Sequence, residues 1–162
     1  MKKEYDFSNA KRGKFYRKDM KFIVSMNEKD RQLIVNFLKK EILNIKAIYI
    51  FGSYADDSAT KESDIDIAYL TPSLLTAVEK WNISQKLANL LSCDVDLVAL
   101  NETNTIFRYQ ILSLGNRIYG EGYDVESFET LAYSFYLRFQ EERKPIVDEI
   151  MKNKSVFWKT YA

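Results

Sequence analysis

Two short motifs of the chain combine residue types that handle phosphate and divalent metal. A Gly-Ser pair, Gly52 and Ser53, is separated by ten residues from an Asp-x-Asp pair, Asp64 and Asp66. A glycine at the end of a strand lets the backbone approach a ligand closely, because it has no Cβ. The serine hydroxyl and the amides of such a turn suit phosphate oxygens. Together, the two motifs predict a site for a nucleoside triphosphate and its metal.

The carboxylates predict where a metal would bind. Asp64 and Asp66 stand two residues apart on an expected strand, so both side chains point to the same face. Neighbouring carboxylates repel each other unless a cation lies between them. Asp94 and Asp96 repeat the arrangement on a later strand, and a third carboxylate joins the cluster if the two strands are neighbours. Carboxylates of this kind suit Mg²⁺, which keeps several waters and completes its shell with substrate phosphates.

The composition excludes several other kinds of chemistry. The chain has no histidine, which removes Ser-His-Asp and Cys-His catalysis as well as His-ligated zinc. Its single cysteine, Cys93, excludes an internal disulfide and a thiolate zinc cluster. Any reaction must therefore use carboxylates, hydroxyls, Lys, Arg and hard metals.

Size and charge predict one domain with a basic arm. The 162 residues are 46% hydrophobic, enough for one domain with a core. No apolar run approaches the roughly 20 residues of a membrane span, so we expect a soluble cytoplasmic protein with no membrane contact. Residues 1–21 hold eight Lys or Arg against three Asp or Glu. We expect residues 1–26 to be a basic N-terminal arm that contacts operator DNA, lies on an acidic partner or solubilises the chain.

Hydrophobic periodicity predicts an alternation of helices and strands between the arm and a tail over residues 151–162. In chain order we expect a helix capped by Asn27 and ending near Lys40, strands over 46–51 and 63–70, a helix opened by Pro72, a strand over 93–100, a helix over 104–114, a strand over 116–120 and a helix over 124–143. This order predicts an α/β (α+β) domain over residues 27–150. It has a small mixed sheet flanked by helices and a C-terminal helix.

Two of these elements carry expectations about burial. The strand over 63–70 alternates, which predicts one buried face and one exposed face that includes Ala68. The final helix is expected to be interrupted by Pro145 near its end. Its apolar stripe is expected to lie in the core and consists of Phe128, Leu131, Ala132, Phe135 and Phe139. The aromatic residues considered for partner contact are Tyr133, Tyr136 and Trp158.

The spacing of the first two motifs resembles the signature of the DNA polymerase β-like nucleotidyltransferase superfamily. The short chain is similar to the minimal nucleotidyltransferases, the MNT antitoxins of HEPN/MNT toxin–antitoxin modules. The later part of the chain also resembles the downstream half of these antitoxins. The two segments that carry this resemblance are VDLVALNETNTIFRYQILSLGNRIYGEG, over residues 95–122, and the later YLRFQEERKPIVDE. The resemblance covers roughly residues 27–150.

This resemblance implies a polymerase β-like nucleotidyltransferase fold and an adenylyltransferase that uses ATP and Mg²⁺. It also implies a HEPN ribonuclease toxin as partner, neutralised by transfer of AMP to a toxin tyrosine. By the same resemblance, Gly52 and Ser53 would hold the triphosphate. The metals would be bound by Asp64, Asp66 and Asp96, and Asp96 would also help to activate the tyrosine hydroxyl.

The chain departs from the family pattern after the Gly-Ser motif. The family commonly has Arg-Gly where this chain has Asp56 and Asp57. Arginine matches phosphate oxygens with a planar fork of donors, whereas carboxylates repel phosphate. Either the arginine is dispensable, or Lys61 replaces it, or triphosphate binding is weak.

Three alternatives therefore stay open. One is an antitoxin with weak catalysis that acts by complex formation. Another is a nucleotidyltransferase acting on a small molecule or a nucleic acid, for which a chain of 162 residues has little room to hold the acceptor. The third concerns the site, where Asp94 could replace Asp96 as the third carboxylate.

Overall fold

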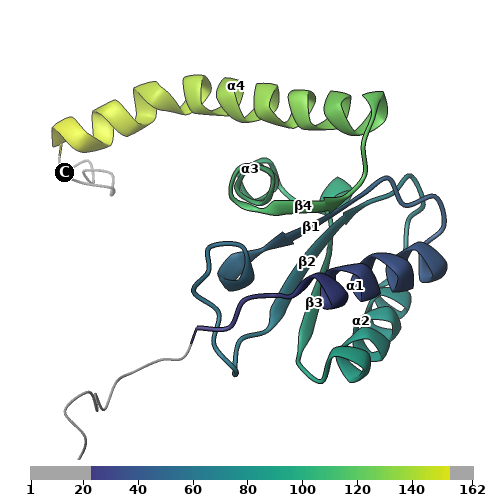
Figure 1. The fold of residues 1–162 in the computed structure, drawn as a ribbon. Helices are drawn as coiled ribbons and strands as arrows, with labels where there is room; N and C mark the ends of the chain where they lie inside the picture. The colour runs from purple at the N-terminus through teal and green to yellow at the C-terminus, as the bar shows by residue number, and fades with distance from the viewer. Residues whose placement is uncertain (1–22, 154–162) are drawn as a thin grey trace, which may run out of the picture.

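The computed structural model describes residues 23–153 and shows the predicted alternation of helices and strands (Figure 1). The helices of this region are α1 (Glu28–Glu41), α2 (Ala77–Leu91), α3 (Thr105–Leu114) and α4 (Tyr123–Asn153). Its strands are β1 (Ala47–Phe51), β2 (Ile65–Leu70), β3 (Val95–Ala99) and β4 (Asn116–Tyr119). No helix within residues 23–153 is both long and apolar enough to span a membrane.

The strands form one mixed sheet in the order β3-β2-β1-β4. Strand β1 is antiparallel to both of its neighbours, and β2 is parallel to β3. A parallel pair needs a crossover connection, which α2 supplies. This connection makes the two aspartate-bearing strands neighbours, so the predicted α/β fold with a mixed sheet is confirmed.

Helices cover both faces of the sheet (Figure 1). Helices α1 and α2 pack on one face, where Leu38 and Leu87 are fully buried among strand residues such as Ile67. Helix α3 and the first part of α4 pack on the other face, against Ala68. The prediction that one face of this strand is exposed holds for Asp64 but is wrong for Ala68, because a second layer of helices covers that part of the strand. Only Asp66, near the start of β2, is partly exposed.

The structure confirms one predicted helix start and corrects another. Asn27 caps α1, and its side-chain oxygen accepts a hydrogen bond from the backbone N–H of Asp30 at 2.8 Å. Helix α2 begins at Ala77 rather than at Pro72. The reason is a capping box, in which the side chains of Thr76 and Glu79 each bond the other's backbone N–H.

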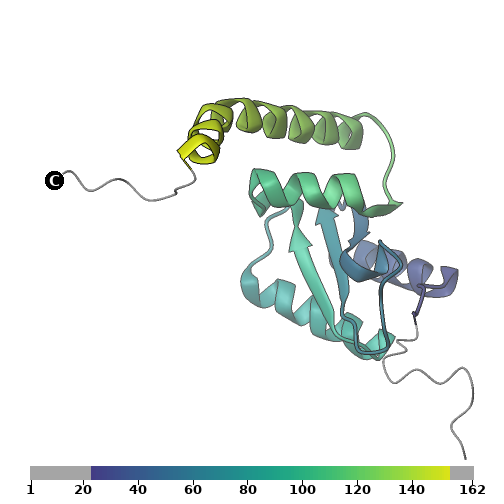
Figure 2. The same cartoon turned by 90° about the vertical axis from the view of Figure 1, so that its left-hand side faces the viewer.

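Helix α4 departs most from the sequence prediction. It runs through Pro145 to Asn153, so the expected interruption near residue 143 is wrong. A proline can sit inside a helix at the loss of one hydrogen bond. The expected core stripe is also only partly buried, because Ala132 is covered while Leu131 and Phe135 are 53% and 48% exposed. Figure 2 shows the helix lying over α3 and continuing past the rest of the fold.

The aromatics considered for partner contact are partly engaged within the domain. The Tyr133 hydroxyl donates to the backbone carbonyl of Leu112 at 3.0 Å, and the Tyr136 ring stacks on that of Tyr109. Trp158 lies outside the described residues, as does most of the predicted basic arm. The last part of that arm packs on the domain, since Met26 belongs to the core.

Candidate active site

The Gly-Ser motif lies where β1 ends. The strand stops at Phe51, and a short 3₁₀ helix, Gly52–Tyr54, follows directly. Gly52 has a φ of +64°, in the left-handed region that side chains disfavour. A Cβ on this residue would collide with Oδ2 of Asp66 and lie 3.1 Å from its Cγ. The predicted phosphate turn and the predicted metal carboxylate therefore meet in the fold, and a side chain at position 52 would displace the Asp66 carboxylate.

The carboxylates gather on neighbouring strands. Asp66 pairs in register with Asp96 in the parallel β2–β3 ladder, and Asp64 directly precedes β2. The pKa of Asp66 is raised above its ordinary value, first by partial burial and then by the charges of Asp96 and Asp64. Asp66 therefore lies close enough to both Asp96 and Asp64 for their charges to act on its carboxyl group.

The register distinguishes Asp96 from the alternative, Asp94. Asp94 uses its backbone carbonyl to accept a hydrogen bond from the N–H of Ile65 at 2.9 Å. Its charge acts on the Cys93 thiol, whose pKa is raised first by burial and then by Asp94. Because only Asp96 pairs with Asp66, the geometry favours Asp96 as the third carboxylate.

The donor chemistry of this cluster fits Mg²⁺, a hard cation that prefers oxygen ligands. Across residues 23–153, however, no three His, Cys, Asp or Glu side chains converge closely enough to hold a metal ion. The raised pKa of Asp66 and this lack of convergence describe carboxylates that interact by charge without sharing one point. Mg²⁺ sites in proteins often use only one or two carboxylates, with water and substrate phosphates as the other ligands.

The loop between the two motifs folds back on Ser53. The backbone N–H groups of Ser58 and Ala59 each donate to the Ser53 carbonyl at 3.0 Å. Asp56 accepts two further hydrogen bonds, from the N–H of Ser58 at 3.0 Å and from its hydroxyl at 2.5 Å. The carboxylate of Asp56 therefore shapes its own loop, while Lys61 is exposed. These hydrogen bonds fix the backbone of Ser53 within the loop.

A partly buried polar network that sequence reasoning missed links β1 to α4. The Tyr49 hydroxyl donates to Oε1 of Glu129 at 2.7 Å, and Arg117 donates to the same oxygen at 3.0 Å. Burial raises the pKa of Tyr49 well above its ordinary value, and Glu129 adds to the effect. The network fixes α4 on the strand that ends at the Gly-Ser turn. Its partners lie too far apart in the chain for any local pattern to indicate it.

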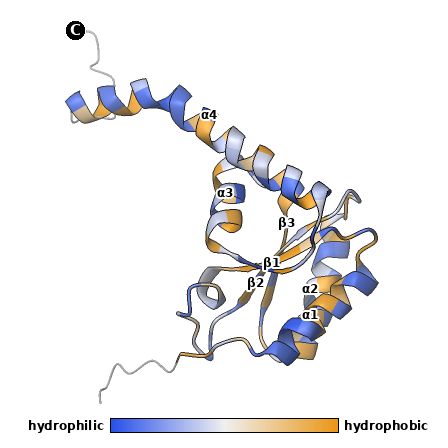
Figure 3. Cartoon of the chain, turned by 45° about the horizontal axis from the view of Figure 1, so that its top comes forward, coloured by the Kyte–Doolittle hydropathy of each residue, from blue (hydrophilic) through white to orange (hydrophobic). Residues whose placement is uncertain are grey.

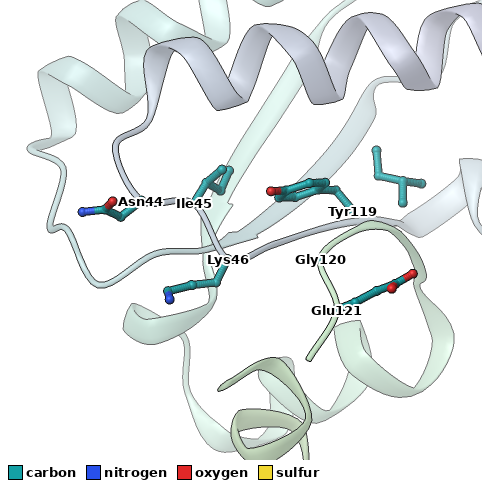
Figure 4. Close-up of a pocket in the computed structure, with 7 residues that line it drawn as sticks. Asn44, Ile45, Lys46, Tyr119, Gly120 and Glu121 are labelled. Atoms are coloured by element: carbon teal, nitrogen blue, oxygen red, sulfur yellow. The ribbon is translucent and has the colours of Figure 1, made fainter. Parts of the chain in front are cut away.

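A hollow of about 600 Å³ lies at the opposite end of β1 (Figure 4). It is lined by Asn44, Ile45, Lys46, Ile118, Tyr119, Gly120 and Glu121. None of the predicted site residues lines it. The charge of Lys46 is paired with Asp124 at 2.8 Å. We therefore place the candidate active site at the acidic edge of the sheet rather than in this hollow.

The fold and the contact between a Gly-Ser turn and an acidic sheet edge define a nucleotidyltransferase of the polymerase β type. The chain belongs to the family described as Polymerase beta, Nucleotidyltransferase, which matches residues 32–124. It is 36% identical over 128 residues to the protein adenylyltransferase MntA of Shewanella oneidensis, covering 79% of this chain and 92% of MntA. The resemblance to the MNT antitoxins is thereby confirmed.

Solved structures give the same result. A toxin–antitoxin structure with AMP-PNP matches with a TM-score of 0.69 and 36% identity, covering 75% of this chain and 98% of the matched one. A structure of the tri-AMPylated Shewanella oneidensis HEPN toxin in complex with MNT antitoxin matches with a TM-score of 0.66 and 35% identity. That match covers 78% of this chain and 99% of the other.

Proposed function

We propose that this chain is an antitoxin that transfers AMP from ATP to a tyrosine of a HEPN-family toxin. The contact between Gly52 and Asp66 carries the proposal, because it joins a phosphate-binding turn to the acidic cluster. The Shewanella relative is a protein adenylyltransferase, and one matched complex contains an AMPylated HEPN toxin. Both support a protein acceptor.

Each site residue has a role in this reaction. Gly52 and Ser53 bind the triphosphate, the former by close approach of its backbone and the latter through its hydroxyl. Asp64, Asp66 and Asp96 hold Mg²⁺, which when bound supplies positive charge to the phosphates. Asp96 lies on β3, the edge strand of the sheet, directly beside Asp66 on β2. It orients the toxin tyrosine and helps to take its proton.

The transfer is balanced without any further reactant. The tyrosine oxygen forms a bond to the α-phosphorus of ATP as the bond from that phosphorus to the bridging oxygen breaks. Pyrophosphate leaves with the electron pair, and the tyrosine proton passes to a carboxylate or to water. AMP remains on the toxin as a phosphodiester.

Asp56 and Asp57 favour a second candidate, in which the antitoxin blocks its toxin by complex formation alone. Their carboxylates stand in the loop next to the Gly-Ser turn, where the family commonly has Arg-Gly, and would weaken triphosphate binding. The hydrogen bonds from Ser58 to Asp56 reduce this effect, because they engage its oxygens within the loop. We therefore rank catalysis first.

Other parts of the account remain predictions. These are the Mg²⁺ dependence, a cytoplasmic location, contact of the basic arm with operator DNA, and the division into an arm, a domain over residues 27–150 and a tail. A salt titration of DNA binding, with and without residues 1–21, tests the arm.

The proposed reaction is tested with labelled ATP. The purified chain is incubated with Mg²⁺, the HEPN protein encoded beside it, and ATP labelled on either the α- or the γ-phosphate. We expect label on the toxin from α-labelled ATP only, and none with the Asp64→Ala/Asp66→Ala variant. A stable complex that gains no label would instead favour blocking by complex formation, and label from the γ-phosphate would indicate a kinase.

A further inference from the structure

The second half of α4 has almost no cover from the rest of the described chain. Between residues 137 and 149 every residue except Phe139 is exposed. The exposed residues include large apolar ones, with Leu137 at 62% and Ile146 at 59%. Figures 1 and 2 show this half, which we call the α4 arm (residues 137–153), standing clear of the sheet and of the other helices.

One face of the arm continues the face by which α4 packs on the domain. Val125 and Ala132 are buried on the domain, and they stand seven residues apart, two turns of the helix. The same seven-residue step leads to Phe139 and then to Ile146 on the arm. Figure 3 shows hydrophobic residues continuing along α4 beyond the domain. A stripe that is core in its first half and uncovered in its second indicates a missing partner.

The α4 arm would have little helical stability by itself. Isolated helices of about this length are marginal in water. Pro145 lies within it and removes one helical hydrogen bond. The covered half is anchored by the Tyr109–Tyr136 stack, whose ring centroids are 3.6 Å apart. The arm therefore leaves the domain from a fixed base, and packing against another surface would stabilise it.

The charges of the arm indicate a protein partner. Acidic and basic side chains balance along it: Glu141, Glu142, Asp148 and Glu149 against Arg138, Arg143, Lys144 and Lys152. A nucleic acid or an anionic membrane would select an excess of basic residues. An apolar stripe flanked by mixed charges instead suits an amphipathic helix or a groove of a protein.

The direction of the α4 arm indicates which protein binds it. In Figure 1 the arm and the short helix of the Gly52–Tyr54 turn both extend toward the left of the view, and Figure 2 looks at the molecule from that side. A protein bound along the arm would therefore lie on the side where AMP transfer takes place. We propose that the α4 arm is the docking surface for the toxin that accepts AMP. This inference rests on the proposed function.

The test compares two glutamates on opposite faces of the arm. Ile146→Glu places a charge on the continuous stripe, and Leu137→Glu places the same charge on the opposite face at a similar exposure. We expect Ile146→Glu to weaken toxin binding by roughly 10- to 100-fold, the equivalent of one buried isoleucine side chain. Transfer should fall through a higher KM for the toxin, with kcat retained. Leu137→Glu should bind and react like the wild type.

Several results would overturn the docking surface. One is wild-type toxin affinity of the Ile146→Glu variant at an unchanged melting temperature. Another is an equal loss of toxin affinity in the Ile146→Glu and Leu137→Glu variants. A third is sedimentation showing that the chain self-associates and that Ile146→Glu abolishes only this association, which would make the face an interface between copies. Because affinity is measured without ATP, a toxin that binds but gains no AMP contradicts the proposed function and leaves the docking surface standing.

Discussion

Alanine substitutions at Gly52 and at a control glycine separate the role of the contact between Gly52 and Asp66 from that of the backbone conformation of Gly52. The residue has a φ of +64°, and its new Cβ would collide with the Asp66 carboxylate. Gly122 provides a matched control, because its φ is +97° and no atom lies within 4 Å of the position of its Cβ. Gly122→Ala therefore introduces backbone strain alone, whereas Gly52→Ala also displaces a proposed metal ligand.

The expected magnitudes follow from this comparison. An L-residue in the left-handed region costs about 1–2 kcal/mol. For a domain of this size, each kcal/mol lowers the melting temperature by roughly 2–4 °C. Both variants should therefore melt about 2–8 °C below the wild type. Only Gly52→Ala moves the carboxylate, and a displacement of about 1 Å at a reacting centre can cost on the order of 100-fold in rate.

The assay measures melting temperature and the rate of AMP transfer to the toxin at saturating ATP. We expect similar melting temperatures for the two variants and a loss of about 100-fold or more in transfer for Gly52→Ala only. Transfer within about threefold of the wild type for Gly52→Ala would refute the role of this contact. So would an equal loss in both variants, since strain alone would then explain the effect.

Two further predictions concern the carboxylates and the polar network. Asp96→Asn should lower kcat by at least about 100-fold, whereas Asp94→Asn should stay close to the wild type, and the opposite ranking would make Asp94 the third carboxylate. Tyr49→Phe tests the network, because the pKa of Tyr49 is raised in the folded state. The protonated phenol contributes its full stability below pH 10, and this contribution is lost as the pH rises from there toward the folded-state pKa. Chemical denaturation should therefore show the wild type losing stability above pH 10 more steeply than the variant, and parallel losses would contradict the assignment.

The element order could be predicted from sequence because its signals are local. Asn27 before an apolar periodic segment specifies the start of α1. The β-branched and aromatic run over 46–51 that stops at Gly52 specifies a strand and its end. The Gly-Ser and Asp-x-Asp motifs flank one loop, so their meeting also follows from short-range structure.

The features that could not be predicted depend on contacts far apart in the chain. Both faces of β2 are buried because α3 and the first half of α4 pack over Ala68, which no alternation within the strand reveals. The pairing of Asp66 with Asp96 depends on strand register, which the sequence leaves open. The bond from Tyr49 to Glu129 joins residues 80 positions apart. Pro145 predicts a break in the helix, but α4 continues through it to Asn153.

The most direct test of the account is the intact mass of the neighbouring HEPN protein after incubation with this chain. The reactions contain ATP with Mg²⁺, ATP with a chelator instead, or the Asp64→Ala/Asp66→Ala variant with ATP and Mg²⁺. We expect mass gains in AMP units in the first reaction only, with the modification on tyrosine. An unchanged toxin mass in the first reaction, beside a stable complex of the two proteins, would contradict it and assign neutralisation to binding alone.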